Sequence, residues 1–203
     1  KEGDRVTGCV AYTRVDGEFH AFSAKSVVLA TGGITRCWSV CSGSWEYTGD
    51  GHALALWAGA ELRDMEFVQF HPTGMVWPPS VRGILVTEGV RGEGGRLTNS
   101  KGERFMFGYV PEMFAGDHAE TIEESDQWVE EVVSGKLATV RRPPELLTRD
   151  VVAKAINSEV KAGRGSPHGG AFLDISHRGE EAILKKLPFQ LDHRPSFELF
   201  AAG

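Results

Sequence analysis

A histidine, a threonine, a glutamate and an arginine lie close together in a segment rich in glycine and proline, residues 67–95. They are His71, Thr87, Glu88 and Arg91. Pro72 holds the backbone of His71 away from helical conformations, so its imidazole is presented from an extended or turn segment. Glycine and proline can fix short polar groups in place without building a core. The pattern favours a preorganised site for an anion.

Each of these side chains also has an ordinary structural explanation. A lone histidine is more often a hydrogen-bonded structural group than a ligand contact, and Glu88 with Arg91 is equally well explained as a structural ion pair. The glycines of residues 89–95 resemble a phosphate loop, but no Gly-Lys-Ser/Thr element follows them, so we reject a P-loop. Their position favours a functional explanation. The polar residues follow the apolar run 84–86, which we expect to form a strand, and binding sites commonly lie at the ends of strands.

Arg149 is a further candidate because of where it lies. It is expected at or near the start of a helix, where the helix dipole disfavours a cation by ~0.3–1 kcal/mol. The neighbouring Asp150 compensates part of that cost. The placement therefore suggests that the sequence keeps a cation there for another reason.

The elements that must position these groups begin with a hairpin. Residues 5–12 and 19–22 are strand-like and flank Asp16 and Gly17. Because Asp-Gly accepts the positive φ values of a tight turn, this pattern predicts a β-hairpin.

A continuous apolar run at residues 27–30 predicts a strand buried on both faces. Its end at residues 31–33 carries two glycines, which let a ligand approach the backbone. Asp50 then precedes a strong helix former, residues 52–58. On residue type alone an N-cap at Asp50, worth ~1 kcal/mol, is favoured over a carboxylate that accepts hydrogen bonds from a ligand.

The second half of the chain reads as two helices and a strand. Residues 117–131 carry many acidic side chains and a weak apolar stripe, which predicts a solvated amphipathic helix without a catalytic role. Residues 145–161 predict a second helix that ends near Gly163. Residues 172–175 predict a short strand.

Composition excludes several classes of protein. A net charge of -6 over 203 residues gives no electrostatic reason to expect nucleic-acid binding. No apolar run approaches the ~20 residues that span a bilayer, so we expect no direct membrane insertion. Cys9, Cys37 and Cys41 lack the ligand pattern of a structural zinc site, and we expect reduced thiols and no metal.

Five motifs in order resemble one family, the flavoprotein subunits of succinate dehydrogenase and fumarate reductase. They are AKSVVLATGG (24–33), SWEYTGDGHALALWAGAELRDMEFVQFHPTG (44–74), TEGVRGEGG (87–95), GERFM (102–106) and LLTRDVVAKAINSEVKAGRG (146–165). The insertion WPPSVRG and the acidic segment look most like the bacterial succinate dehydrogenase branch. The resemblance covers residues 5 to about 187 and implies an α/β (α+β) fold.

The resemblance also implies roles for individual residues. Those that would contact the cofactor FAD are Ala30, Thr31, Gly32, Gly33 and Asp50. His71 and Thr87 match the residues that bind a substrate carboxylate, and Arg149 matches the acid/base residue that takes a proton from succinate. Glu88 and Arg91 match the proton relay behind it. Free arginine is a very poor base, since its pKa exceeds ~12, so the relay carries the chemical argument.

By the same resemblance, residues 1–66 are part of a Rossmann-like FAD-binding domain, residues 67–187 are the capping domain that closes over substrate, and residues 188–203 diverge from the family. The family's first strand and GxGxxG turn do not precede Lys1, so we expect an internal fragment that is inactive in isolation. The complete protein would interconvert succinate and fumarate. It would pass electrons to quinone through an iron-sulfur subunit, docked through membrane-anchor subunits at the cytoplasmic face of the bacterial inner membrane.

Two alternatives stay open. Fumarate reductases and L-aspartate oxidases share these motifs, so the first alternative is that the chain comes from one of these enzymes. A catalytically silent remnant that binds no flavin is the alternative of another class. A flavin absorption band would distinguish the enzyme from the remnant.

Overall fold

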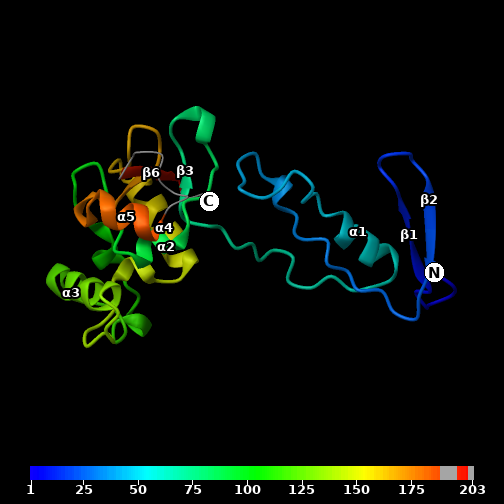
Figure 1. Ribbon diagram of the computed structural model, residues 1–203, viewed down its shortest axis with the longest axis horizontal. Coiled ribbons are helices and arrows are strands. Elements are labelled where there is room, and N and C mark those ends of the chain that lie inside the picture. Colours follow the sequence, from blue (N-terminus) through cyan, green and yellow to red (C-terminus); the bar gives the residue numbers. More distant parts are fainter. Residues whose placement is uncertain (188–195, 201–203) are drawn as a thin grey trace. The chain divides into compact units, whose positions relative to one another are not determined.

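The computed structural model describes residues 1–187 and 196–200, the last five by their backbone alone. The chain divides into two compact units, Lys1–Val68 and Gln69–Gly203. In Figure 1, β1, β2 and α1 belong to the first unit and the other labelled elements to the second. The mixed helices and strands confirm the expected α/β fold class. The assignment of residues 1–66 and 67–187 to FAD-binding and capping domains stays a prediction, and the divergent tail lies largely outside the described residues.

The first unit contains the predicted hairpin. Strands β1 (Gly8–Tyr12) and β2 (Phe19–Ser23) pair antiparallel, with Val10 opposite Ala21. Gly17 in the turn has a φ of 77°, the left-handed conformation for which glycine is favoured. This prediction is therefore confirmed.

The buried strand predicted at residues 27–30 is wrong. The segment has no strand hydrogen bonding, and Val28 is 88% exposed. A buried strand needs neighbours on both edges and covers on both faces, whereas the sheet described in the first unit consists of β1 and β2 alone. The apolar run is present, but nothing in this unit pairs with it.

Helix α1 (Asp50–Trp57) follows, close to the predicted bounds. The prediction of Asp50 as N-cap is wrong, because Gly49 occupies that position with a φ of 87° and Asp50 is the first helical residue. The Asp50 carboxylate instead accepts a hydrogen bond from the Thr48 hydroxyl, 2.6 Å away. A short 3₁₀ turn, η1 (Thr35–Cys37), precedes α1.

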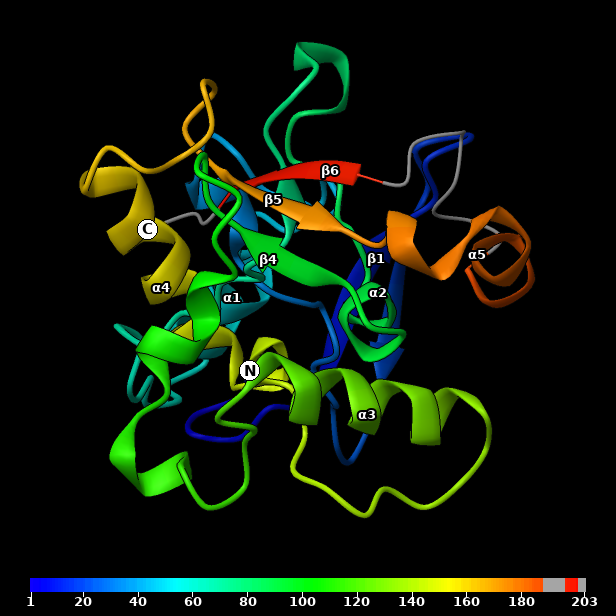
Figure 2. The same ribbon diagram turned by 90° about the vertical axis from the view of Figure 1, so that its left-hand side faces the viewer.

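The second unit is built on an antiparallel sheet with strand order β3-β6-β5-β4. The strands are β3 (Gly74–Met75), β4 (Arg96–Thr98), β5 (Ala171–Asp174) and β6 (Ser196–Phe200). Figure 2 shows β4, β5 and β6 side by side. Strand β5 confirms the strand predicted at residues 172–175.

The described part of this unit also contains the helices α2 (Glu88–Gly92), α3 (Ile122–Val133), α4 (Arg149–Lys161) and α5 (Glu180–Lys186). Further 3₁₀ turns are η2 (Pro79–Val81), η3 (Phe105–Tyr109), η4 (Glu112–Phe114), η5 (Pro144–Leu146) and η6 (Ser176–Arg178). The helix predicted from residue 145 thus begins at Arg149, after η5. Val152 and Ile156 of α4 pack with Leu97 of β4 and Leu173 of β5 in one buried cluster.

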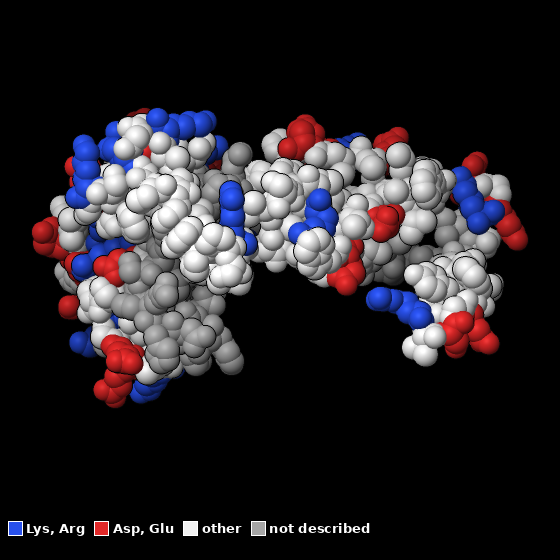
Figure 3. All heavy atoms as spheres, turned by 90° about the horizontal axis from the view of Figure 1, so that it is seen from above, with Lys and Arg blue, Asp and Glu red and all other residues white. Residues whose placement is uncertain are grey.

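Helix α3 is amphipathic as predicted, but its apolar stripe is narrower. Val129 is buried, whereas Ile122 is 47% exposed. The Thr121 hydroxyl caps the helix by accepting a hydrogen bond from the Glu124 amide at 3.2 Å. Its acidic side chains are paired rather than simply solvated, for example Glu124 with Arg141 at 2.8 Å. Acidic and basic side chains are interspersed on the face seen in Figure 3.

Among the described residues, none of the helices has the length and apolar character needed to cross a bilayer. Nor do three or more His, Cys, Asp or Glu side chains gather there in a way that would hold a metal ion. The three cysteines are free thiols.

Candidate active site

Arg149 and Arg91 share a single carboxylate in the second unit. Arg149 Nε donates to Glu88 Oε2 at 3.3 Å, and Arg91 Nη2 lies 3.7 Å from the same oxygen. Arg149 Nη1 also donates to Gln69 Oε1 at 3.2 Å. Residues that are 61 and 80 positions from Arg149 in sequence therefore meet at its guanidinium.

Helix ends place these groups. Thr87 is the N-cap of α2, and its hydroxyl accepts a hydrogen bond from the Gly89 amide at 3.4 Å. Glu88 and Arg91 thus lie in a one-turn helix rather than in a loop. The strand predicted at residues 84–86 is wrong: Leu85 forms only an isolated bridge with Gly74, and α2 begins three residues after it with Thr87 as cap. Arg149 is the first residue of α4, as expected.

Arg91 is completely buried. Its Nη1 donates to the main-chain oxygen of Glu145, while Nε and Nη2 have no hydrogen-bond partner among the described residues. Burial lowers the pKa of Arg91, and the nearby Arg149 lowers it further, against the opposing charges of Glu88 and Glu145. A buried guanidinium with spare donors and a lowered pKa is suited to exchange a proton with a neighbour.

His71 is partly buried, and its neighbour Thr73 fixes its tautomer. The Thr73 amide donates to His71 Nδ1 at 3.3 Å, and the Thr73 hydroxyl donates to the Val86 carbonyl at 2.7 Å. Because the amide hydrogen is fixed in direction, Nδ1 must be an acceptor, which assigns the ring proton to Nε2.

The charge of His71 follows from its surroundings. Burial, and then the positive charges of Arg149 and Arg91, lower the pKa of His71 from 6.5 to about 4. At neutral pH the ring is therefore uncharged and offers one donor, Nε2–H. A neutral donor beside two arginines is well suited to a carboxylate oxygen.

The structure thus brings together His71, Thr87, Glu88, Arg91 and Arg149 within one unit, and it adds three residues that the sequence did not single out. They are Gln69, Thr73 and Glu145. Thr73 had a local signal, since a side chain two residues after a histidine can bond back to it. Gln69 and Glu145 act across long sequence separations and had none.

The residues expected to contact FAD lie in the first unit, where two of their segments touch. A Cβ at Gly51, in the first turn of α1, would overlap the Thr31 hydroxyl. A Cβ at Gly32, whose φ is 75°, would lie 2.7 Å from the Tyr47 ring. These glycines therefore permit backbone contacts that a side chain would block.

The same segments fit a large anionic cofactor. Ala30, Thr31 and Asp50 are exposed, and an added Cβ at Gly33 meets nothing within 4 Å. The first amides of α1 lack intrahelical partners, and a helix N-terminus favours anionic groups. Open backbone, exposed polar side chains and helix-start amides are what a nucleotide cofactor requires.

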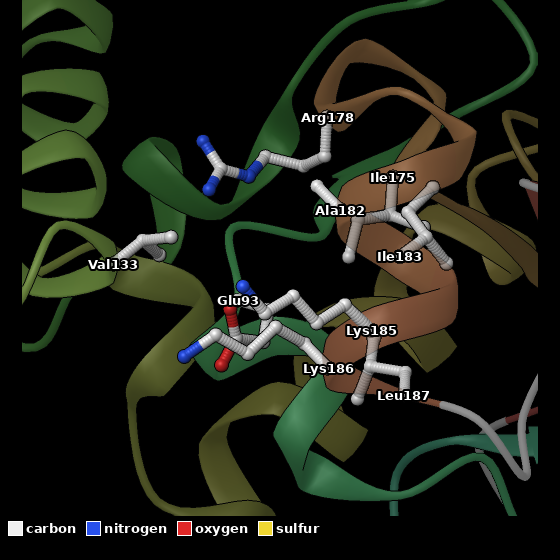
Figure 4. Close-up of a pocket in the computed structure, with 9 residues that line it drawn as sticks. All are labelled: Glu93, Val133, Ile175, Arg178, Ala182, Ile183, Lys185, Lys186 and Leu187. Atoms are coloured by element: carbon white, nitrogen blue, oxygen red, sulfur yellow. The ribbon is translucent and has the colours of Figure 1, made fainter.

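A separate cavity of about 100 Å³ opens beside α5 (Figure 4). Its described lining residues are Glu93, Val133, Ile175, Arg178, Ala182, Ile183, Lys185, Lys186 and Leu187. None of the predicted site residues is among them. The cavity therefore does not coincide with the arginine cluster, which is distinguished by its paired charges.

Comparison with known proteins gives consistent results. A family model described as "FAD binding domain" matches residues 1–197. The chain is 44% identical to a fumarate reductase (CoM/CoB) subunit of Methanothermobacter marburgensis over 94% of its length, and 38% identical to the succinate dehydrogenase flavoprotein subunit of Rickettsia bellii over 92%. It spans 29% and 26% of these relatives, less than a third of each.

Solved structures of the same kind of protein are also similar to the chain. A quinol-fumarate reductase with menaquinol molecules matches 93% of the chain at 36% identity, with a TM-score of 0.70, and the chain covers 29% of it. The Sdh1 complex of Mycobacterium smegmatis in its apo form matches 97% at 46% identity, with a TM-score of 0.56, and the chain covers 28% of it.

Proposed function

The chain belongs to the FAD-binding domain family, and from that premise we propose that it is a piece of a flavoprotein subunit that interconverts succinate and fumarate. FAD is the cofactor of the family. The relatives are succinate dehydrogenase and fumarate reductase subunits by name, which supports an oxidoreductase of this kind. The reaction itself is the proposal.

The observation that carries the proposal is the sharing of the Glu88 carboxylate by Arg149 and Arg91. A structural ion pair needs one partner of each sign. Here two guanidiniums compete for one carboxylate, and the buried one has donors without a partner among the described residues. That arrangement leaves a proton able to move between neighbours when charge develops at Arg149.

Substrate binding falls to His71 and Thr87. The Nε2–H of the neutral His71 donates to one oxygen of a substrate carboxylate, and the Thr87 hydroxyl provides a second donor at the start of α2. Hydrogen bonds to ionised oxygens are about twice as strong as neutral ones, so two fixed donors suffice to orient the dicarboxylate.

In succinate oxidation the Arg149 guanidinium passes a proton to Glu88 as it takes up the proton from the substrate carbon, and fumarate reduction reverses both transfers. Glu88 and Arg91 relay that proton, because Glu88 touches both guanidiniums. Ala30, Thr31, Gly32, Gly33 and Asp50 would hold the FAD. When bound, the flavin supplies the hydride-accepting chemistry, and the residues of this chain orient substrate and handle its proton.

The complete protein would act with partners. The relatives are named as subunits, and the mycobacterial structure is described as a complex. We propose that electrons pass to an iron-sulfur subunit, and that membrane-anchor subunits hold the assembly at the cytoplasmic face of a bacterial inner membrane.

Arg149→Lys in the complete, flavin-loaded subunit tests the acid/base assignment. A lysine keeps the charge but loses the forked contact to Glu88 and Gln69. We expect kcat to fall by about 10³-fold or more, about 4 kcal/mol in transition-state free energy, with bound flavin unchanged. Succinate oxidation with a dye acceptor and fumarate reduction with a reduced dye measure both directions.

Arg82→Lys is the matched control, because Arg82 is an exposed arginine in the same unit. Its kcat should stay within twofold of the parent. If Arg149→Lys retained full turnover, the acid/base assignment would fail. If the parent oxidised aspartate with oxygen instead of succinate, or held no flavin, the proposed function itself would fail.

A further inference from the structure

Glu145 is a buried glutamate that bonds in two directions. Its side chain is fully inaccessible to solvent. Its main-chain oxygen accepts the hydrogen bond from Arg91 Nη1, while its carboxylate faces Arg104. One residue thus connects the proposed proton relay to a different part of the unit.

Arg104 holds the Glu145 carboxylate through both of its oxygens. Nε donates to Oε1 at 2.6 Å and Nη2 to Oε2 at 3.0 Å. The remaining Arg104 donors reach Ser125 at 2.6 Å and Asp126 at 3.1 Å, both in α3. Burial would lower the pKa of Arg104, but hydrogen bonding to Glu145 and the charges of Glu145 and Asp126 outweigh it and raise the pKa. The Arg104 guanidinium therefore stays charged.

The position of Glu145 in the chain matters as much as its contacts. It lies in η5, which leads directly to Arg149 at the start of α4. The Leu146 and Leu147 amides bond back to Pro143 and Pro144, so the turn between is rigid. Fixing Glu145 in the core consequently fixes where α4 begins.

We infer that Glu145 is a positioning residue for the proton relay: its carboxylate, clamped by Arg104, holds the turn that presents its own carbonyl to Arg91 and places Arg149 four residues later. This inference rests on the proposed function. It assigns Glu145 no contact with substrate or flavin. Its role is to keep two arginines at the distances that allow Glu88 to serve both.

Glu145→Gln in the complete, flavin-loaded subunit tests the inference. The amide keeps the volume and one acceptor but removes the charge and half of the clamp, so the turn loosens. We expect kcat to fall about tenfold, with KM for succinate within twofold because His71 and Thr87 are untouched. Glu145 faces Arg104 through its side chain and Arg91 through its main chain, and Arg104 also faces Asp126. Loss of the Glu145 charge should therefore move the pH profile of kcat to lower pH, since that charge raises the pKa of Arg91.

Glu159→Gln is the matched control. Glu159 is 2% exposed, lies in α4 and is clamped by Arg164 at 2.7 and 2.8 Å, but its partners do not include the relay. It should lose comparable thermal stability while kcat and its pH profile stay unchanged. The inference is overturned if Glu145→Gln keeps parental kcat, or if both variants lose kcat in parallel with their melting temperatures. A parent with flavin but no turnover would instead overturn the proposed function, and the inference with it.

Discussion

The two units of the chain hold their candidate residues in different ways. In Lys1–Val68, all of which the structure describes, Gly51 is the single buried residue, and Trp57 and Phe19 are 77% and 79% exposed. In the second unit, Ile156 and Leu173 are completely buried in one cluster with residues of α2, β4 and α5. The first unit is held by local hydrogen bonds, and the second by a core.

This difference shows what holds the candidate residues of each unit in place. The arginine cluster stands on α2 and α4, whose apolar faces are buried, so its geometry is set by packing within the unit. The segments proposed to hold the flavin stand on a short helix and close glycine contacts, and large apolar side chains of the same unit, such as Trp57 and Phe19, are exposed. The proposed acid/base residues are thus held by a core of this chain, whereas the proposed flavin-contacting residues are held by local contacts.

The largest effect on the free energy of unfolding should come from truncating a side chain in the core. Ile156→Ala removes a completely buried side chain from α4 and should lower the free energy of unfolding by about 3 kcal/mol. Leu54→Ala in α1, where the leucine is 52% exposed, should cost less than about 1 kcal/mol. Urea unfolding of this 203-residue chain, followed by circular dichroism, measures both. Equal costs at the two sites would remove the contrast between the units.

A smaller effect is expected where the first unit relies on a glycine. Gly51→Ala forces its Cβ against the Thr31 hydroxyl, so the segment around Thr31 must move. In the complete protein we expect flavin affinity to fall at least about tenfold, about 1.4 kcal/mol, by titration of the apoprotein. Gly116→Ala, where an added Cβ meets nothing within 4 Å, is the control. Unchanged flavin affinity in Gly51→Ala would show that this contact does not shape the cofactor site.

The smallest effect is a pH dependence in the second unit. The pKa of His71 is about 4 in the folded protein and 6.5 when unperturbed. The unfolded state therefore binds the proton first, and stability falls as pH drops from about 6.5 to about 4. Because His71 is partly exposed, solvent screening reduces the effect to about 1 kcal/mol.

His71→Gln should remove this part of the acid sensitivity in urea unfolding at pH 7 and pH 4. Proton NMR of the parent should show the imidazole titrating near pH 4 with its hydrogen on Nε2. Titration near 6.5 would mean that the site is more open than the structure indicates.

The sequence predicted elements best where the signal was local. The Asp16-Gly17 hairpin and helix α1 follow from turn chemistry and helix propensity, and both are present. The strand at residues 27–30 failed because burial depends on neighbours that periodicity does not reveal. Asp50 is not the cap for a different reason: Gly49 occupies that position with a positive φ, which suits a glycine.

Prediction of the site divided along the same line. Residue type and spacing single out His71, Thr87, Glu88 and Arg91, and these residues lie near Arg149. Glu145 was missed because its bond to Arg91 crosses 54 residues and uses a main-chain oxygen. A main-chain acceptor leaves no trace in residue type, so only the fold could reveal it.

The Arg104–Glu145 pair and the contacts of Glu88 with its two arginines differ in distance, which separates a fixed pair from a loosely held carboxylate. Arg104 donates to the two oxygens of Glu145 at 2.6 and 3.0 Å, whereas Glu88 Oε2 lies 3.3 and 3.7 Å from its two arginines. A short ion pair with two hydrogen bonds resists displacement, so Arg104 and Glu145 keep their segments fixed. A carboxylate held loosely between two guanidiniums can move toward either one at little cost in energy. The contacts of Glu88 are therefore the ones that a small change in geometry would alter first.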